Sequence, residues 1–194
     1  MLKIHTLILG LYQVNCYIVH REDSRECLVI DPGDAPEKIL QFLREQGLQA
    51  EAILLTHGHF DHVGAMRALE KELDCPVYVR EEEQTMPAAL TAGSLGGTLP
   101  YPSVLSLAGM DISVHHTPGH TRGSVCLVID DVMFSGDTLF AGSCGRTDLP
   151  GGDWVTIRTS LEYLKNLPGD YRVLPGHGEE TTLTRERQTN PYLR

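Results

Sequence analysis

Residues 53–64 read ILLTHGHFDHVG, an apolar run that leads directly into three histidines and an aspartate. In an extended strand end, residues two positions apart point the same way, so His57 and His59 can bind one metal ion together. If the chain then turns into a helix, Asp61 and His62 point elsewhere and can serve a neighbouring ion, a split that favours two metals over one. Imidazole with a carboxylate suits zinc, iron or manganese, and a motif without thiolate argues against a structural zinc site.

Three later segments repeat the pattern of an apolar run that ends in a potential ligand beside glycine. The potential ligands are His120 in TPGHT (117–121), Asp137 in SGDT (135–138) and His177 in PGHG (175–178). Because ligands at the carboxyl ends of strands converge in one crevice of an α/β sheet, we expect these three to join the first motif. The glycines leave room for the backbone to approach an ion closely.

The other histidines are not expected to bind metal. His115 and His116 precede His120 by only a few residues, but alternation along a strand sends at least one of them away from the crevice. We therefore expect this pair to pack in the core or on the surface. His5 and His20 receive no role.

Composition limits the partners that the chain can have. Lys and Arg number 16 against 26 Asp and Glu, a formal net charge of -10, which repels nucleic-acid phosphates and anionic lipid. No apolar stretch is long enough for a membrane span or clean enough for a signal peptide. Five cysteines without a C-x-x-C pair fit a reducing compartment. We therefore expect a cytoplasmic protein that binds neither nucleic acid nor membrane.

Hydrophobic periodicity predicts a single α/β domain over residues 1–194, because short β-branched runs alternate with helical stretches and no linker divides them. We expect strands at residues 4–9, 15–19, 27–30, 52–55, 77–79, 112–115, 124–129, 132–134 and 171–174.

Three helices are predicted from caps and apolar spacing. The first begins at an Asp34 cap with Glu37 completing a capping box, and it ends at Gly47. The second runs from about Asp61 to Leu73. The third runs from Asp153 to Asn166 and turns four apolar residues inward, namely Val155, Ile157, Leu161 and Leu164.

The segment between the second helix and the later strands has little periodicity. Residues 86–103 carry several glycines and prolines, which predicts either a surface loop that lies over the site or a disordered connection. The preceding acidic run, Glu81 to Glu83, is interpreted as a solvated helix start and not as a cation site.

Together these motifs resemble those of the metallo-β-lactamase superfamily, and within it the compact glyoxalase II-like (hydroxyacylglutathione hydrolase-like) thioester hydrolases. The resemblance covers nearly the whole chain. It is carried by NCY (15–17), VIDPG (29–33), THGHFDH (56–62), TPGHT (117–121), SGDTLF (135–140), CGRTD (144–148), PGHG (175–178) and ERQTNPY (186–192).

The resemblance implies a four-layer αββα sandwich that holds two divalent metal ions. By position, His57, His59 and His120 hold the first metal, Asp61, His62 and His177 hold the second, and Asp137 bridges them. Asp31 is implied to be a structural residue behind the ligands. Zinc is the expected metal, with iron and manganese as alternatives.

The implied chemistry is thioester hydrolysis, as of S-lactoylglutathione. Two cations that share one water supply hydroxide near neutral pH, which attacks the carbonyl, so no protein nucleophile is needed. Asp61 and Asp137 are the expected catalytic carboxylates. A thioester suits this chemistry because a thiolate, with a conjugate-acid pKa of about 8.5, leaves with little protonation.

The residues expected to recognise the substrate differ from the pattern of the glyoxalase II-like enzymes that the chain resembles. Full-length glyoxalase II enzymes carry an additional C-terminal helical domain that grips glutathione, which a chain ending at Arg194 is expected to lack. We expect substrate contacts from Arg146 in the CGRTD segment, from Arg122, where relatives often carry Pro or Ser, and from Tyr101 on the predicted loop.

The main alternative is an iron-dependent persulfide dioxygenase of the same superfamily. Such enzymes resemble this chain in the motif histidines and in CGRTD, but they use a single iron at the positions of His57, His120 and Asp137. We favour the hydrolase because PGHG (175–178) resembles the dinuclear form of that motif. β-Lactamase, lactonase, RNA-processing and flavin-linked di-iron functions rank lower. The expected partner is a small-molecule thioester, and the oligomeric state is left open.

Overall fold

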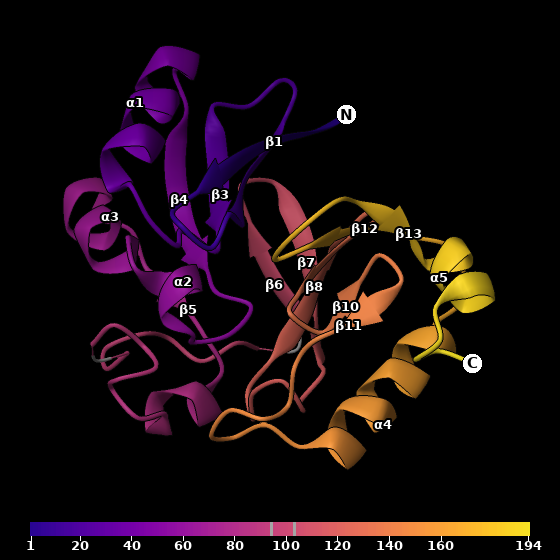
Figure 1. Cartoon of the computed structure of the whole chain (residues 1–194). Helices are drawn as coiled ribbons and strands as arrows, with labels where there is room; N and C mark the ends of the chain where they lie inside the picture. Colours follow the sequence, from indigo (N-terminus) through magenta and orange to yellow (C-terminus); the bar gives the residue numbers. More distant parts are fainter. Residues whose placement is uncertain (94, 103) are drawn as a thin grey trace.

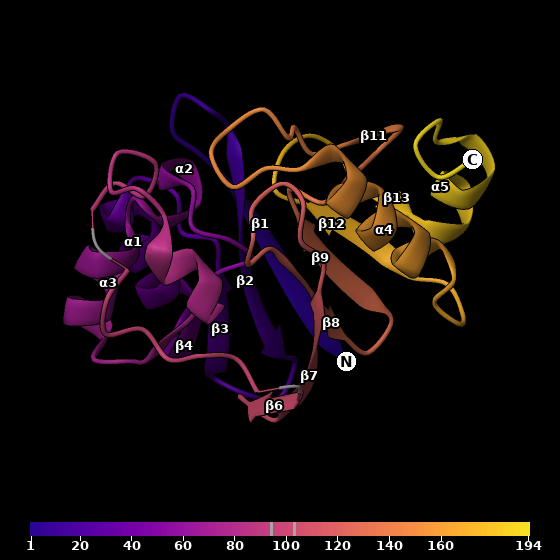
Figure 2. The same ribbon diagram turned by 90° about the horizontal axis from the view of Figure 1, so that it is seen from below.

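The chain folds into two β-sheets that face each other, with helices on both outer sides (Figure 1). The computed structural model describes residues 1–93, 95–102 and 104–194. Figure 2 shows the layers from another side, with α1 (Pro36–Gln46) and α3 (Met66–Leu73) beyond one sheet, and α4 (Trp154–Lys165) and α5 (Leu183–Thr189) beyond the other. This arrangement confirms the expected four-layer αββα sandwich.

The first sheet has five strands in the order in which they occur along the chain. They are β1 (Leu2–Leu9), β2 (Val14–Arg21), β3 (Glu26–Ile30), β4 (Gln49–Leu54) and β5 (Val77–Tyr78). The first three pair antiparallel, whereas β3, β4 and β5 are parallel. The carboxyl ends of β3 and β4 therefore lie at one edge of this sheet.

The second sheet has the strand order β13-β12-β9-β8-β7-β6. Its strands are β6 (Val104–Leu107), β7 (Met110–His116), β8 (Val125–Ile129), β9 (Val132–Gly136), β12 (Arg172–Pro175) and β13 (Thr181–Thr182). All pairs are antiparallel except β9 with β12, which run parallel. Two short strands, β10 (Leu139–Phe140) and β11 (Ser143–Cys144), form a separate hairpin. Each of the nine predicted strands overlaps an observed one.

The central strands are buried on both faces, and this produces three apolar layers. On β3, Cys27 and Val29 pack toward the helices, whereas Leu28 and Ile30 pack into the layer between the sheets. The same alternation places Cys126 of β8 against the layer under α4. Strands buried on both sides read as continuous apolar runs, which is why the sequence shows these strands clearly.

The first helix differs from its prediction at the start. α1 has Ala35 as its N-cap, in the left-handed conformation with φ 49°, and no side chain caps it. Asp34 accepts a hydrogen bond from the Ala35 amide instead. Because Pro36 occupies the first helical turn, the residue before it is kept out of the helical region and the capping box cannot form. The predicted end is confirmed, since Gly47 caps the helix with φ 65°.

The predicted second helix is divided into two. A single turn, α2 (Phe60–Val63), is followed by a break and then by α3. At the break, the Ala65 amide donates to the carbonyl of Pro32, 3.0 Å away, instead of continuing the helical ladder. The prediction of one continuous helix was therefore wrong, because a contact with the loop after β3 competes for the backbone donor.

The third helix is confirmed at both ends. Asp153 caps α4 and accepts from the amide of Thr156 at 2.7 Å. Three of the four predicted inward residues are fully buried, namely Ile157, Leu161 and Leu164. Val155 is 72% exposed, so its inward assignment was wrong. Ser160 takes the fourth inward position, since it shares the helical face of Ile157 at a spacing of three residues.

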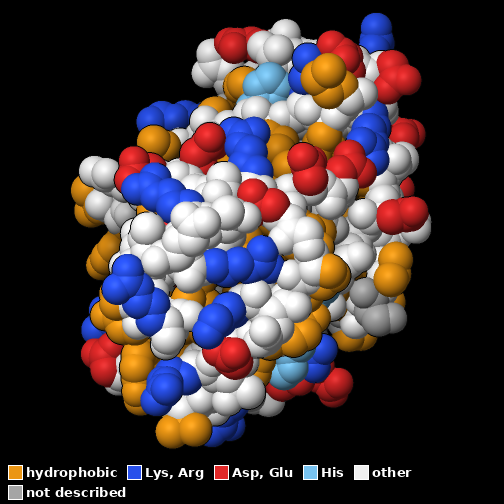
Figure 3. All heavy atoms as spheres, turned by 90° about the vertical axis from the view of Figure 1, so that its right-hand side faces the viewer, with side chains coloured by type: hydrophobic (Ala, Val, Ile, Leu, Met, Phe, Trp, Pro, Cys, Tyr) orange, Lys and Arg blue, Asp and Glu red, His pale blue; other side chains and the backbone are white. Residues whose placement is uncertain are grey.

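The surface over α4 and α5 is mixed in character. Figure 3 shows Lys and Arg side chains interspersed with acidic and apolar ones on this side of the molecule. Within the described part of the chain, no helix is both long and apolar enough to cross a membrane.

Two substitutions in α4 test the layer under this helix. Ile157→Ala should lower the free energy of unfolding by about 2–5 kcal/mol, because it leaves a cavity in a buried layer. Val155→Ala, two residues away on the exposed side, should change it by less than about 0.5 kcal/mol. Denaturant unfolding at fixed metal concentration measures both, and equal losses would contradict the assignment of the inward face.

Candidate metal centre

The potential ligands lie on chain segments that leave strand ends. His57 and His59 follow β4, and Asp137 and His177 follow β9 and β12. The last two strands are parallel neighbours with Gly136 opposite Pro175, so the residues that come next start side by side. The seven candidate side chains therefore converge at one end of the sandwich, as expected for ligands at strand ends.

One group consists of three buried imidazoles. His57, His59 and His120 each offer a ring nitrogen, and these atoms lie within 4.8 Å of one another. Nδ1 of His59 and Nε2 of His120 are 2.9 Å apart. Three imidazole nitrogens that face a common point are a suitable ligand set for a first metal ion.

A second group lies beside the first and includes a carboxylate. Asp61, His62 and His177 again place one atom each within 4.8 Å of the others. His177 Nε2 is 3.2 Å from Asp61 Oδ2 and 3.3 Å from His62 Nε2. The two groups adjoin, since the ring centroids of His57 and His62 are 4.1 Å apart, and His57, His62 and Asp137 form a further set within 4.8 Å. The split between two ions stays a prediction.

Asp137 lies between the two groups. Its Oδ2 is 3.5 Å from Nε2 of His120 and 3.8 Å from Nε2 of His177. Its Oδ1 is 3.4 Å from Nε2 of His62. A carboxylate in this position is within reach of both groups, which is the geometry that a bridging ligand requires.

Contacts behind the imidazoles set which nitrogen faces the centre. Nδ1 of His120 donates to the backbone carbonyl of Arg146 at 2.8 Å, and Nδ1 of His177 donates to the carbonyl of Tyr12 at 3.0 Å. In both rings Nε2 is thereby left as the inward atom. Such outer contacts fix ring orientation and tautomer at metal sites.

Asp31 fixes the orientation of the His62 ring in the same way. It follows β3 directly, in the left-handed region with φ 50°. Its Oδ2 accepts from His62 Nδ1 at 2.9 Å and from the Thr56 hydroxyl at 2.6 Å, while Oδ1 accepts from the Thr56 amide. The expectation of a structural role for Asp31 is therefore confirmed.

Burial and charge set the protonation of the ligands. Burial lowers the pKa of His57 well below its usual value, and the neighbouring His62 and His120 lower it further. Burial also lowers the pKa of His59 to about 4. Burial alone would raise the pKa of Asp137, but the charges of His62 and His120 outweigh it and lower the pKa. His57 and His59 are therefore neutral, as metal binding requires. Burial disfavours the charged forms of His62 and His177, but Asp137 and Asp31 raise the pKa of His62 and a hydrogen bond with Asp61 raises that of His177, so an ion that binds there displaces protons from these two rings.

The fit to a metal ion rests on polar atoms that lack partners. Among the described residues, three buried side-chain atoms lack a hydrogen bond. Two of them, Nε2 of His57 and Oδ1 of Asp137, belong to the centre, whereas the third, Nε2 of His59, lies across the ring from the Nδ1 that faces His120. A buried polar atom without a partner costs free energy unless something compensates it. Gly176 contributes by being small, because a Cβ there would lie 2.3 Å from Asp137 Oδ1 and 2.5 Å from His62 Cε1. The donor set and its packing fit two divalent cations.

A cavity of about 500 Å³ opens beside the two groups. One side is formed by the ligands His59, Asp61, His120, Asp137 and His177. The remaining wall is mostly apolar and consists of Tyr12, Phe60, Leu90, Phe140, Leu149 and Arg146. These apolar wall residues were not predicted, because they come from five separate segments that only the tertiary fold brings together.

The three predicted substrate contacts have different outcomes. Arg146 lies on the cavity wall, where its side chain pairs with Asp148 at 2.7 Å and both are mostly exposed. Tyr101 lies against the layer between the sheets, its ring stacked on Tyr78 and its hydroxyl donating to the carbonyl of Leu55. It is not among the described residues that line the metal cavity, because its ring packs into the core.

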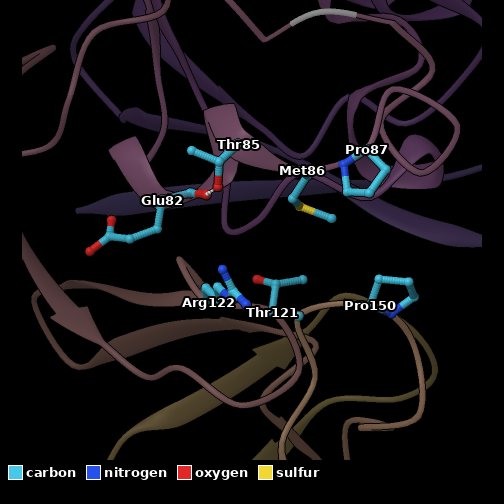
Figure 4. Close-up of a pocket in the computed structure, with 8 residues that line it drawn as sticks. Glu82, Thr85, Met86, Pro87, Thr121, Arg122 and Pro150 are labelled. Atoms are coloured by element: carbon cyan, nitrogen blue, oxygen red, sulfur yellow. Dashed lines mark hydrogen bonds between the residues drawn. The ribbon is translucent and has the colours of Figure 1, made fainter.

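Arg122 lines a different pocket of about 240 Å³ (Figure 4). There it faces the segment that carries Glu82, Thr85 and Met86. Among the described residues that line the metal cavity, Arg122 is absent. Its contact with a substrate stays a prediction.

The remaining histidines follow the expectation. Nδ1 of His115 lies 2.7 Å from the hydroxyl of Tyr163, and Nε2 of His116 donates to the Arg122 carbonyl. His5 and His20 stack on each other with ring centroids 5.4 Å apart. None of these four rings belongs to the metal-binding groups found among the described residues.

Residues 81–103 agree only in part with the predictions made for them. The 3-10 helix η1 (Glu81–Thr85) confirms that a helical turn begins at the acidic run, but Glu83 within it is fully buried, so the interpretation of a solvated run was wrong for this residue. Leu90 of the predicted loop lines the metal cavity, which fits a loop over the site. Ser94 and Ser103, also in that loop, lie outside the described residues.

Comparisons with known proteins identify relatives of this chain. The family profile described as the metallo-beta-lactamase superfamily covers residues 9–177. The probable metallo-hydrolase YqgX of Bacillus subtilis is 37% identical over 99% of this chain and 98% of its own length. The hydroxyacylglutathione hydrolase GloC of Haemophilus influenzae is 32% identical over 94% of this chain and 93% of its own length.

Solved structures agree with the sequence matches. The structure of TTHA1623 in a di-iron-bound form superposes with a TM-score of 0.87 at 40% identity, over 97% of this chain and 100% of that one. The structure of the BLEG-1 B3 metallo-beta-lactamase superposes with a TM-score of 0.90 at 36% identity, over 100% of this chain and 99% of that one.

Two histidines four residues apart test the ligand assignment. His120→Ala should remove metal from the purified protein, because it deletes a nitrogen from the first group, whereas His116→Ala should leave the metal content unchanged. Elemental analysis of both variants, with circular dichroism to confirm folding, makes the comparison. Metal loss in His116→Ala would mean that the wrong histidine had been chosen.

Asp137→Ala addresses the bridging position. Because its carboxylate lies within reach of both groups, its loss should reduce the content of both metals and abolish turnover. A variant that keeps two metals or full activity would exclude a bridging role for Asp137.

Proposed function

The chain belongs to the metallo-beta-lactamase superfamily, and from that premise we propose that it hydrolyses small-molecule thioesters, with S-lactoylglutathione as the reference substrate. The observation that carries this proposal is the pair of ligand groups at the edge of one largely apolar cavity. The similarity to GloC, whose name describes a hydroxyacylglutathione hydrolase, supports the choice of thioester.

The residues present would hold two divalent cations. The first group is His57, His59 and His120, the second is Asp61, His62 and His177, and Asp137 lies between them. When bound there, two such ions would lower the pKa of a shared water and polarise a carbonyl oxygen. Zinc is our first choice because of the imidazole-rich donor set, and the di-iron form of a related structure keeps iron as the alternative.

Two carboxylates of the chain serve the reaction directly. Asp61 and Asp137 both line the cavity. Burial raises the pKa of Asp61, but the hydrogen bond from His177 and the charge of His62 outweigh burial and lower it. Both groups are therefore ionised near neutral pH and can accept a proton or a hydrogen bond from an attacking water.

The cavity wall suits a thioester. Phe60, Phe140 and Leu149 present apolar surface to an acyl group and exclude water from the reacting carbonyl. Arg146 is the only Arg or Lys among the described lining residues, and it stands where an anionic part of the substrate could pair with it. A thiolate leaving group needs little protonation, so the apolar wall does not have to supply an acid.

A persulfide dioxygenase remains the second candidate function. It would need only His57, His120 and Asp137 around one iron. Asp61, His62 and His177 do not decide between the two functions, because such enzymes resemble this chain in the motif histidines as well. The hydrolase is preferred because PGHG (175–178) resembles the dinuclear form of that motif.

We also propose that the working partner is a small molecule in a reducing compartment such as the cytoplasm. The net charge of -10 disfavours phosphate-rich partners. Four of the five cysteines are buried as free thiols, which fits a compartment where thiols stay reduced.

The decisive experiment is hydrolysis of S-lactoylglutathione by the purified protein. Loss of thioester absorbance is followed in separate samples supplied with zinc, iron or manganese. Metal-dependent turnover that disappears in Asp137→Ala and persists in His116→Ala is expected. If no metal supports turnover, oxygen consumption with glutathione persulfide and iron becomes the next measurement, and activity there would replace the hydrolase proposal.

Arg146 provides a test of substrate recognition. Arg146→Ala should raise KM for an anionic thioester roughly two- to fivefold, the scale of an exposed charge contact, and leave kcat nearly unchanged. A neutral thioester should show no change, and Arg158→Ala, an exposed arginine on α4, should affect neither substrate. An equal increase of KM for both substrates would contradict a charge contact.

A further inference from the structure

Glu83 is a fully buried carboxylate in a segment that the sequence presents as a charged surface. It lies in η1, and none of its surface is exposed. Its neighbour Glu82 pairs with Arg80 at the surface, as an ordinary member of an acidic run does. A carboxylate without contact to water is costly to bury unless its oxygens are satisfied.

Both oxygens of Glu83 accept hydrogen bonds from backbone amides. The amide of Gly58 donates to Oε2 at 2.7 Å, and the amide of Gly123 donates to Oε1 at 2.6 Å. Burial raises the pKa of Glu83, while hydrogen bonds from Thr121, Gly123 and Gly58 oppose that rise. Since each oxygen faces a donor, the carboxylate form fits the site better than the protonated acid.

The two donors belong to the two chain segments that carry the first metal group. Gly58 lies between His57 and His59, and Gly123 comes three residues after His120. The segments are far apart in sequence and leave different sheets. One side chain from a third segment therefore connects the backbones on which all three imidazoles are mounted.

Gly58 and Gly123 leave the space that this contact needs. A Cβ on Gly123 would lie 2.7 Å from both Cγ and Oε1 of Glu83. A Cβ on Gly58 would lie 3.0 Å from Oε2 of Glu83 and 2.8 Å from a methyl of Leu95. The distances at Gly123 and the one to Leu95 are shorter than a side-chain carbon allows, and the 3.0 Å distance at Gly58 is tight. A side chain at either position would therefore disturb the contact of the carboxylate with the two amides.

The position of η1 agrees with this role. In Figure 4, the segment with Glu82 and Thr85 stands opposite Thr121 and Arg122 across the pocket. Thr121 itself is held by Ser124, whose hydroxyl accepts from the Thr121 amide at 3.1 Å. η1 and the His120 segment thus face each other in the fold, and Glu83 is the charged connection between them.

We propose that Glu83 is a positioning residue that holds the His57–His59 segment and the His120 segment in register, and so sets the geometry and affinity of the first metal group. It makes no contact with substrate in this role. The inference rests on the metal-binding part of the proposed function, but not on the identity of the substrate, because its readout is metal binding itself.

The primary variant is Glu83→Gln, which keeps size and shape. A glutamine offers one oxygen acceptor and one NH₂ group, and the NH₂ group must face one of the two backbone donors. One connection is therefore lost and the two segments are no longer held together. We expect the zinc affinity of the first group to fall at least tenfold and that of the second group by less than threefold.

Competition with a chromophoric chelator gives the two zinc constants, which His120→Ala and His177→Ala assign to the first and second groups. Substitution with Co²⁺ adds a spectroscopic measurement, since its visible bands report the geometry of the ligands. Glu83→Gln should change the Co²⁺ bands of the first group. Neither measurement uses a thioester, so failure of the hydrolase proposal and failure of this one are distinguishable.

Glu186 supplies a matched control in the same chain. It is also fully buried, and it accepts from the amide of Gly142 at 2.8 Å and from the hydroxyl of Thr181 at 2.6 Å. It lies in α5 and contacts none of the ligand segments through these bonds. Glu186→Gln should lower the thermal midpoint as much as Glu83→Gln does, but it should leave both zinc constants within twofold of the wild type.

Gly123→Ala is a second variant that tests the proposal if Glu83→Gln does not fold. Its methyl group would move the carboxylate away from the backbone amides, although residue 83 itself is unchanged. We expect the same change in the Co²⁺ bands of the first group. The proposal is overturned if a folded Glu83→Gln or Gly123→Ala protein keeps the wild-type first-group affinity and Co²⁺ spectrum. It is also overturned if Glu186→Gln weakens zinc binding as much as Glu83→Gln does.

Discussion

Seven polar side chains direct their functional atoms toward one small volume at the end of the sandwich, and two of those atoms, Nε2 of His57 and Oδ1 of Asp137, are buried without a hydrogen bond among the described residues. In a protein interior such an arrangement is unfavourable unless a cation compensates it. The cost is distributed over α2 and the segments next to β4, β8, β9 and β12, so both sheets contribute to one centre. The apolar cavity beside it is then the natural place for a substrate.

The sandwich supports this centre through contacts that involve the backbone as much as side chains. The carbonyls of Tyr12 and Arg146 orient two imidazoles, and Asp31 orients a third. Glu83 does not contact the imidazole rings. It accepts hydrogen bonds from the backbone amides of Gly58 and Gly123, in the segments that carry the ligands. These main-chain groups belong to loops that connect directly to strands, so the sheets determine where they lie.

Much of the architecture could be predicted, because each layer leaves a local signal. Strands buried on both faces appear as apolar runs, and the end of α1 and the start of α4 are marked by a glycine and an aspartate. The capping box of α1 failed for a local reason, the Pro36 that follows Ala35. Two further differences arose where a distant segment competed for a local group. The Ala65 amide leaves its helix for Pro32, and Tyr101 packs against Tyr78 in the core instead of reaching the cavity. Neither partner is near in sequence.

The candidate ligands were predicted from residues 53–64 and three short motifs, because metal chemistry requires particular side chains at particular spacings. Their full assignment to two metals came from the resemblance to the metallo-β-lactamase superfamily and stays a prediction. The wall of the cavity and the buried state of Glu83 could not be read in this way. Glu83 stands in a run of three glutamates that differ in nothing local. Which of them is buried depends on where the amides of Gly58 and Gly123 meet in space, and only the packing of the two sheets brings those amides to one point.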